Sequence, residues 1–289
     1  MNKPRHQQEA AAVIGAGTMG GGVAEVLAAS GCEVILYDVT REALDEGVQR
    51  IQRRLGRQMK KGRIEEAEAE EIQFRIRPTV RLEEVAPARW VIEAVVEKLD
   101  VKRELFTRLE EVVDGESVLA TNTSSLSVTA IAAAVKHPER VLGLHFFNPA
   151  PVMPLVEVVS GRMTHADTMD RAVSFIAALG KEPVRVKDTP GFLVNRIARP
   201  FHSEAYRMVG DGVADKEQLD RILRSAGFKM GPFELQDLIG IDINYAASTS
   251  VYDGFFQEPR FRPHPDQRQM VESGALGRKA GRGHYRHGG

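Results

Sequence analysis

His145 and Glu157 are the first residues whose types and spacing suggest chemistry. His145 interrupts the apolar run VLGLHFFNP at residues 141–149, and Glu157 lies in the next apolar run, PLVEVVSG. A carboxylate buried in a strand is costly without a partner, which the imidazole would supply. The same contact would fix the ring tautomer and stabilise an imidazolium, so the two residues are candidates for a general acid–base pair. A neutral histidine packed in the core is the alternative for His145.

A glycine fingerprint lies near the start of the chain. The runs AAVIGAG and CEVILYDV are typical of buried strands, and Gly15, Gly17 and Gly20 form G-x-G-x-x-G after the first of them. In that motif the first glycine makes a tight turn, the second lets a pyrophosphate approach the backbone, and the third lets a helix pack closely. Asp38 would accept hydrogen bonds from the adenosine ribose, which predicts NAD as the cofactor, and Arg41 leaves NADP open.

Polar residues follow the ends of several apolar runs. Glu97 ends WVIEAVVE, and Asn122 and Ser124 follow SVLAT. Because a doubly wound sheet binds ligands at the carboxyl ends of its strands, we expect these residues to converge with His145 on one site. Ser124, His145 and Glu157 could also form a hydrolase triad. Against this, the chain has no G-x-S-x-G elbow at Ser124, and the glycine fingerprint would be unexplained.

Residues 40–73 depart from the alternation of strands and helices. Leu44 and Ile51 belong to an apolar stripe of helical spacing, and an acidic stretch, RIEEAEAEEI, follows. The opposite face of the first helix is basic and carries Arg50, Arg53, Arg54, Arg57, Lys60 and Lys61. This basic face is either a solvated surface or a contact for a phosphate-bearing substrate.

The strand patterns stop after VRVKD, and Thr189 with Pro190 is typical of a helix cap and first turn. We therefore expect an α/β Rossmann-type NAD-binding domain at residues 1–187, with a helical hairpin insertion at about 40–73. An all-α C-terminal domain for substrate binding and dimerisation is expected at residues 188–289.

The composition argues against several classes of protein. The 289 residues carry a formal net charge of −1, so we expect no nucleic-acid or membrane partner. The chain has no apolar run of the ~18 residues that a spanning helix needs, and its single cysteine, Cys32, allows no internal disulfide. A cytoplasmic protein is expected because no convincing leader is found. No metal site is expected, because His284 and His287 lack matching ligands upstream and are interpreted as part of a mobile tail.

The chain contains five motifs in order, GAGTMGGGVA, NTSSL, GLHFFNPAPVMPLVEVV, KDTPGFLVNRI and GPFELQDLIGID. Together they resemble the L-3-hydroxyacyl-CoA dehydrogenases, in particular the short bacterial 3-hydroxybutyryl-CoA dehydrogenases. The resemblance extends from about residue 10 to about residue 286. It implies reversible, NAD-dependent oxidation of an (S)-3-hydroxyacyl-CoA thioester, with a short acyl chain, by a homodimer.

The resemblance also implies roles for individual residues. His145 and Glu157 match the catalytic pair of the family, and Ser124 and Asn195 match polar residues that position the substrate. The cofactor contacts expected on this basis are Gly15, Gly17, Thr18, Met19, Gly20, Asp38, Glu97, Lys102, Asn122, Ser124, Asn148 and Lys279.

The basic residues have other possible roles. Arg54, Lys60 and Lys61 are expected to contact the CoA part of the substrate, although Arg54 stands where some relatives have a small polar residue. Lys102 could instead be a charge on a helix surface. Lys279 could belong to a flexible tail.

Other functions remain open at this point. A dehydrogenase for 3-hydroxyadipyl-CoA or another dicarboxylic acyl-CoA is one alternative, and a gulonate or lambda-crystallin-like NAD dehydrogenase is another. The 3-hydroxyacid dehydrogenases place a lysine one helical turn from an asparagine, and no such lysine accompanies Asn195. A non-catalytic NAD-binding protein is the remaining alternative, which the intact His145 and Glu157 disfavour.

Overall fold

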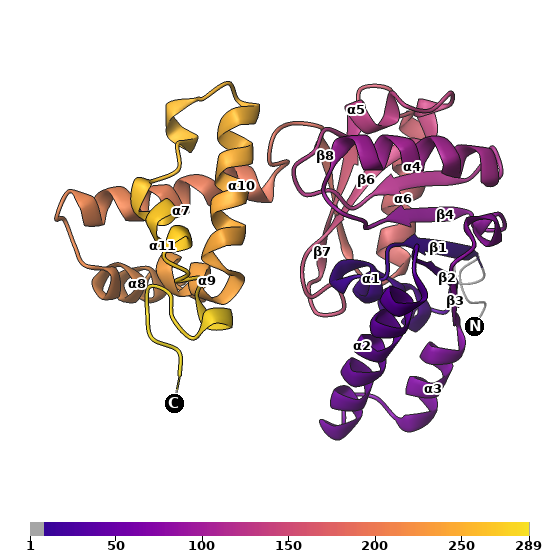
Figure 1. Ribbon diagram of the computed structural model, residues 1–289, viewed down its shortest axis with the longest axis horizontal. Helices are drawn as coiled ribbons and strands as arrows, with labels where there is room; N and C mark the ends of the chain where they lie inside the picture. Colours follow the sequence, from indigo (N-terminus) through magenta and orange to yellow (C-terminus); the bar gives the residue numbers. More distant parts are fainter. Residues whose placement is uncertain (1–8, 289) are drawn as a thin grey trace. The chain divides into compact units, whose positions relative to one another are not determined.

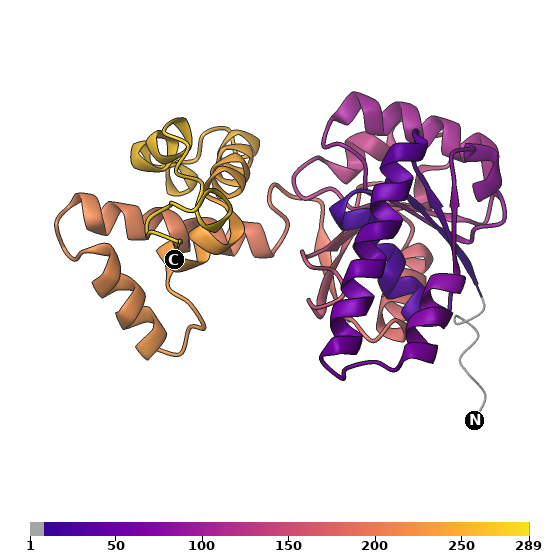
Figure 2. The same ribbon diagram turned by 60° about the horizontal axis from the view of Figure 1, so that its bottom comes forward.

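The computed structural model describes residues 9–288. The chain forms two compact units, and the boundary between them follows Asp188 (Figure 1). The first unit is an eight-stranded sheet with helices on both faces, and the second unit consists of helices (Figure 2). Among the described residues, no helix is long and apolar enough to cross a membrane.

The sheet of the first unit has the strand order β3-β2-β1-β4-β5-β6-β7-β8. Its strands are β1 (Ala10–Ile14), β2 (Glu33–Tyr37), β3 (Ile76–Thr79), β4 (Trp90–Glu93), β5 (Val118–Thr121), β6 (Val141–Phe146), β7 (Leu155–Ser160) and β8 (Glu182–Lys187). Neighbouring strands are parallel, with the exception of β6 and β7. The chain order reverses between β1 and β4, and open α/β sheets bind ligands at such a point.

Helices cover both faces of this sheet, which explains why inner strands such as β1, β4 and β5 are nearly continuous apolar runs. The edge strands β3 and β8 are more polar and less buried. The helices are α1 (Thr18–Ala29), α2 (Arg41–Lys60), α3 (Glu66–Phe74), α4 (Leu99–Val112), α5 (Val128–Ala132) and α6 (Ala166–Ala178), with 3-10 turns at Leu82–Val85 and Pro138–Arg140. One apolar cluster includes Leu27 of α1 and Phe175 of α6, and the other includes Phe106 of α4 and Ile131 of α5. The expected hairpin insertion is formed by α2 and α3, and the Thr40 hydroxyl caps α2.

The second unit contains α7 (Val194–Gly210), α8 (Lys216–Ser225), α9 (Pro232–Ile239), α10 (Ile241–Gly254) and α11 (Pro265–Glu272), with 3-10 turns at Pro259–Phe261 and Arg278–Ala280. Its C-terminal residues pack against this helical body. Buried Asp237 accepts hydrogen bonds from the N–H groups of His284 and Tyr285, and His287 Nε2 lies 2.6 Å from its carboxylate. The prediction of a mobile tail is therefore wrong, because the tail supplies the donors that a buried carboxylate requires. Among the described residues, no cluster of His, Cys, Asp and Glu could hold a metal ion.

His202 of α7 makes stability of the second unit sensitive to acid. It is 2% exposed, and burial together with the nearby Arg199 lowers its pKa from 6.5 to about 3. Between these values the unfolded chain binds a proton that the folded chain does not, so stability falls as pH decreases below 6.5. We expect His202→Gln to reduce this slope by up to about 1.4 kcal/mol per pH unit. Urea unfolding followed by circular dichroism at pH 7, 6 and 5 measures how the free energy of unfolding depends on pH. The control is His137→Gln, because His137 is exposed. A slope that is unchanged in His202→Gln contradicts the prediction.

Candidate active site

The glycine fingerprint forms the turn between β1 and α1. Gly15 has a φ of +105°, and a Cβ there would lie 2.7 Å from the Ala94 carbonyl oxygen. A Cβ at Gly20 would lie 1.8 Å from the carbonyl oxygen of Gly15, so a larger residue does not fit. A Cβ at Gly17 would meet nothing within 4 Å, which leaves this backbone open to a ligand. Gly17 directly precedes α1, and the first turn of α1 has no acidic residue. The free backbone N–H groups of this turn can therefore bind a phosphate.

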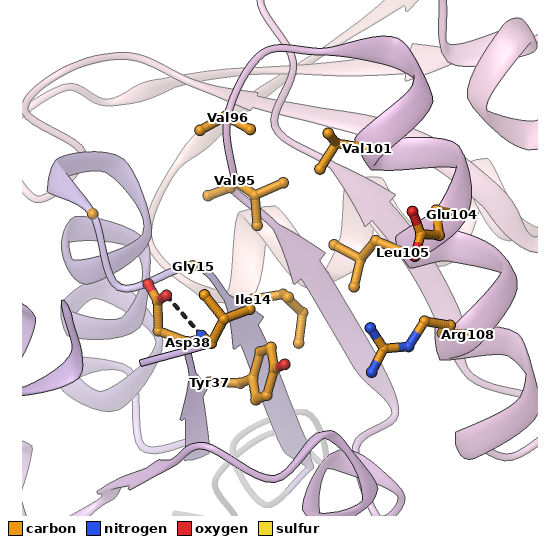
Figure 3. A pocket seen from close by; sticks show the side chains of 13 residues that line it. Ile14, Gly15, Tyr37, Asp38, Val95, Val96, Val101, Glu104, Leu105 and Arg108 are labelled. Atoms are coloured by element: carbon orange, nitrogen blue, oxygen red, sulfur yellow. Dashed lines mark hydrogen bonds between the residues drawn. The ribbon is translucent and has the colours of Figure 1, made fainter. Parts of the chain in front are cut away.

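A pocket of about 460 Å³ lies beside this turn, at the carboxyl ends of β1 and β2 (Figure 3). Asp38 lies on one side of the pocket, and Val95 and Leu105 lie across from it. The two oxygens of Asp38 accept hydrogen bonds from the N–H groups of Ala16 and Val39, both at 2.7 Å. The pocket therefore combines apolar walls, which suit a flat ring, with a carboxylate held in place. These are the features that bind the adenosine part of a dinucleotide.

Lys102 is buried and joins two carboxylates. Its Nζ donates a hydrogen bond to Glu93 at 2.6 Å and lies 3.2 Å from Glu97. Glu93 has no exposed surface and also accepts hydrogen bonds from the Thr121 hydroxyl and the Val95 N–H. Lys102 is therefore not a surface charge, and the ion pair fixes α4 against the ends of β4 and β5.

Glu97 forms the outer end of this network. Burial disfavours its charged form, but the Lys102 ammonium and hydrogen bonds from the Thr123 hydroxyl and the Ser124 N–H outweigh burial. The pKa of the Glu97 carboxyl therefore lies below its ordinary value. With a side chain 37% exposed, Glu97 presents a fixed negative charge at the surface of the site. Such a carboxylate can accept hydrogen bonds from the hydroxyls of a ligand.

His145 and Glu157 form a buried pair on adjacent strands. The antiparallel register of β6 and β7 places the two residues directly opposite each other. His145 Nδ1 lies 2.6 Å from Glu157 Oε2, and the two side chains are 8% and 0% exposed. A proton on Nδ1 donates to the carboxylate, which leaves Nε2 as the nitrogen that can accept a proton.

The loops after β5 and β6 bring further predicted residues to the same edge of the sheet. The side-chain oxygen of Asn122 accepts a hydrogen bond from the N–H of Phe146, the residue that follows His145. Ser124 is exposed in the loop after β5, and Asn148 is exposed in the loop after β6. The predicted residues that the first unit carries in the α1 turn, at these strand ends and in the loops after them are Gly15, Gly17, Thr18, Met19, Gly20, Asp38, Glu97, Asn122, Ser124, His145 and Asn148. Lys102 lies in α4 and contacts Glu97 from there.

The predicted CoA contacts on α2 differ from one another. Arg54 Nε donates to Glu25 of α1 at 2.6 Å, and its Nη2 donates to the Gly21 carbonyl at 2.8 Å. Arg54 therefore packs α2 on α1 and is less available to a substrate than its sequence position suggests. Lys60 and Lys61 are exposed at the C-terminal end of α2.

The second unit carries the other two predicted residues, Asn195 and Lys279. Asn195 lies in the first turn of α7 and is half-buried. Lys279 Nζ lies 2.6 Å from a carboxylate oxygen of Asp242 in α10. Burial alone would raise the pKa of the Asp242 carboxyl, but the ammonium of Lys279 holds it below its ordinary value. Lys279 is thus an anchored residue of the C-terminal segment.

Glu93 is the site residue that the sequence reasoning missed. Its signal was present, since Glu93 is a carboxylate inside the apolar run WVIEAVVE, as Glu157 is in PLVEVVSG. Burying a carboxylate without a hydrogen-bond partner is unfavourable for Glu93 as it is for Glu157, so a buried donor near Glu93 could have been predicted. Glu104 and Arg108 of α4 were also missed, and both line the pocket of about 460 Å³.

Comparisons with known proteins agree with this geometry. The model of the 3-hydroxyacyl-CoA dehydrogenase NAD-binding domain matches residues 10–189, and that of the C-terminal domain matches residues 191–287. The chain belongs to the 3-hydroxyacyl-CoA dehydrogenase family. The predicted family, the Rossmann-type fold followed by a helical domain, and NAD as cofactor are confirmed. The predicted enzyme class, an NAD-dependent 3-hydroxyacyl-CoA dehydrogenase, is confirmed at the level of the family.

Individual relatives differ in length. The 3-hydroxyadipyl-CoA dehydrogenase of Escherichia coli K12 is 50% identical over 275 residues, which cover 95% of this chain and 58% of that protein. The 3-hydroxybutyryl-CoA dehydrogenase of Clostridioides difficile is 40% identical, with 95% and 98% covered. The crystal structure of (S)-3-hydroxybutyryl-CoA dehydrogenase from Ralstonia eutropha superimposes with a TM-score of 0.92 at 36% identity, with 98% and 99% covered.

Proposed function

We propose that the protein oxidises a short-chain (S)-3-hydroxyacyl-CoA, such as 3-hydroxybutyryl-CoA, to the 3-oxoacyl-CoA with NAD, reversibly. The observation that carries this proposal is the buried contact of 2.6 Å between His145 and Glu157 in a domain with an NAD fingerprint. The pair provides an imidazole whose orientation and charge are both controlled, which general acid–base catalysis requires.

The proposed reaction removes two hydrogens from the alcohol, the one on C3 as a hydride to the cofactor and the one on the oxygen as a proton to the imidazole, and the oxygen stays on C3 as the ketone. NAD, when bound, supplies the acceptor for the hydride that leaves C3. In the oxidation, His145 Nε2 takes the proton of the hydroxyl group. In the reduction, the imidazolium of His145 returns a proton to the ketone oxygen. Glu157 accepts the hydrogen bond from Nδ1 and balances the positive charge that forms on the ring.

Polar and charged residues would hold the two ligands. We assign Ser124 and Asn195 to the oxygen on C3, and Lys60 and Lys61 to the CoA phosphates. The assigned cofactor contacts are Gly15, Gly17, Thr18, Met19, Gly20, Asp38, Glu97, Lys102, Asn122, Ser124, Asn148 and Lys279. Lys102 would act by holding Glu97, since its own ammonium is buried between carboxylates. Arg54 would need to leave Glu25 in order to contact the CoA.

We also propose a cytoplasmic homodimer in which the second unit supplies the dimer surface. Large apolar side chains are exposed on this unit, including Ile197, Ile222, Phe228 and Phe256. The first unit also exposes such side chains, but the second unit carries as many on a much shorter stretch of chain, which favours association with a second copy through it. The cytoplasmic location is supported by the cysteine content, since Cys32 is the single cysteine of the sequence and no internal disulfide can form.

Turnover of acetoacetyl-CoA tests the proposed reaction. Purified protein should oxidise NADH, followed by absorbance, with acetoacetyl-CoA and not with free acetoacetate. Turnover of a free sugar acid in place of any thioester would contradict the proposal and favour a gulonate-type dehydrogenase. A dicarboxylic acyl-CoA is the second candidate substrate, because the relative that is 50% identical is named a 3-hydroxyadipyl-CoA dehydrogenase.

A further inference from the structure

Arg199 of α7 is a buried cation whose hydrogen bonds leave one edge of the guanidinium unused. The residue is 5% exposed. Its Nη1 donates to the Asn244 carbonyl at 3.0 Å and lies 3.4 Å from both the Asn244 side-chain oxygen and the Ser248 hydroxyl of α10. Nε is fully buried and has no hydrogen-bond partner among the described residues. The hydrogen bonds that Arg199 makes with described residues are donated by Nη1. The Nε–Nη2 edge is the one that binds a carboxylate with two parallel hydrogen bonds.

No carboxylate of residues 9–288 lies within salt-bridge distance of Arg199. Two arginines of the first unit differ in this respect, because buried Arg140 lies 3.5 Å from Glu110 and half-buried Arg54 pairs with Glu25. Burial lowers the pKa of Arg199 to about 10. Its neighbour His202, whose pKa is lowered to about 3, is neutral and supplies no negative charge. A buried cation without a counter-ion is costly, so an anion from outside the described chain would stabilise it.

The position of Arg199 on α7 indicates where such an anion would lie. Arg199 follows Asn195 by four residues, so the two side chains lie on the same helix face about 6 Å apart along the axis. Under the proposed function, Asn195 contacts the oxygen on C3 of the acyl chain. In a six-carbon dicarboxylic acyl group the terminal carboxyl carbon lies three carbon–carbon bonds beyond C3, about 4 Å away when extended, and in an eight-carbon group about 6.5 Å. A terminal carboxylate of such a chain therefore matches the spacing on α7.

We propose that Arg199 binds the terminal carboxylate of a dicarboxylic 3-hydroxyacyl-CoA with a chain of six to eight carbons. The Nε–Nη2 edge would donate two hydrogen bonds to the carboxylate, while Asn244 and Ser248 hold Nη1 and so fix the plane of the guanidinium. This inference rests on the proposed function and narrows it, because Arg199 would select dicarboxylic over monocarboxylic chains of equal length. An unpaired buried guanidinium would disfavour an apolar chain end at the same position.

The test compares two thioesters that differ only in the terminal group, 3-hydroxyadipyl-CoA and 3-hydroxyhexanoyl-CoA. The unmodified protein should have the higher kcat/KM for the dicarboxylic substrate, chiefly through a lower KM. Arg199→Met should reduce the ratio of the two kcat/KM values by at least about 30-fold, as expected for loss of one partner of a buried charge pair. Arg199→Lys should recover part of the ratio. Arg207→Met is the matched control on the same helix, because Arg207 pairs with Glu204 on the surface and should leave the ratio unchanged.

Each outcome decides one of the two proposals. A ratio at or below one in the unmodified protein overturns the assignment of Arg199, even if the variants do not fold. An unchanged ratio in a folded Arg199→Met variant overturns it as well. If neither thioester is oxidised, the proposed function fails, and calorimetric binding of adipyl-CoA against hexanoyl-CoA still tests Arg199. Preference for adipyl-CoA that is lost in Arg199→Met supports the inference in that case, and equal binding overturns it.

Discussion

His145→Gln is expected to lower kcat by about 10²–10⁴-fold, the usual contribution of general acid–base catalysis. Glutamine can still reach Glu157 with its amide, so the packing around the buried carboxylate is largely kept. The variant has no group that takes a proton near neutral pH. Affinity for NADH should change by less than about threefold, because the glycine turn and Asp38 do not contact His145. Steady-state kinetics with acetoacetyl-CoA and a fluorescence titration with NADH measure the two quantities.

A second histidine–glutamate pair provides the control for this experiment. His137 Nδ1 lies 3.2 Å from Glu139, but both side chains are more than half exposed. His137→Gln should leave kcat unchanged. The comparison distinguishes the loss of a buried histidine–glutamate pair at the site from the loss of an exposed one elsewhere. If His145→Gln keeps normal turnover, His145 is a packed core histidine and the proposed acid–base role is wrong.

The pairing of His145 with Glu157 could be proposed from their residue types, whereas the strand register that brings them into contact could not be predicted. A polar residue inside an apolar run is visible in the sequence and raises the question of its partner, which is why His145 and Glu157 were singled out. Their contact depends on β6 and β7 running antiparallel in one particular register. A shift of one residue would turn Glu157 to the opposite face of the sheet. The local pattern of apolar residues contains no information on that register.

The glycine turn was predictable in more detail, because its requirements are local. The positive φ of Gly15 and the close approach of Gly20 to the Gly15 carbonyl both arise within the turn, and the contact of Gly15 with Ala94, just after β4, adds to them. Arg54 is the opposite case. Arg54 belongs to a basic helix face, and only the packing of α2 on α1 shows that it forms an ion pair with Glu25. The C-terminal tail was misjudged for the same reason, since its anchor, Asp237, lies about 50 residues earlier.

Lys102→Met is expected to destabilise the first unit by about 3–5 kcal/mol, because it leaves a buried carboxylate without its cation. Glu93 has no exposed surface, and the hydrogen bonds from Thr121 and the Val95 N–H do not compensate a full charge. Affinity for NADH should fall as well, since Glu97 loses the ammonium that holds its carboxylate. Urea unfolding followed by fluorescence reports on this unit, because Trp90 of β4 is the only tryptophan.

Two further variants separate the charge from the loss of a side chain. Lys98→Met removes an exposed lysine next to the start of α4 and should change stability by less than about 0.5 kcal/mol. Glu93→Gln combined with Lys102→Met removes both buried charges and should recover much of the stability lost in Lys102→Met, because an unpaired buried charge costs more than a missing pair. Affinity for NADH should stay low in the double variant, since Glu97 still lacks its cation. Recovery of both quantities together would mean that Lys102 acts on the fold alone and that holding Glu97 has no part in binding the cofactor.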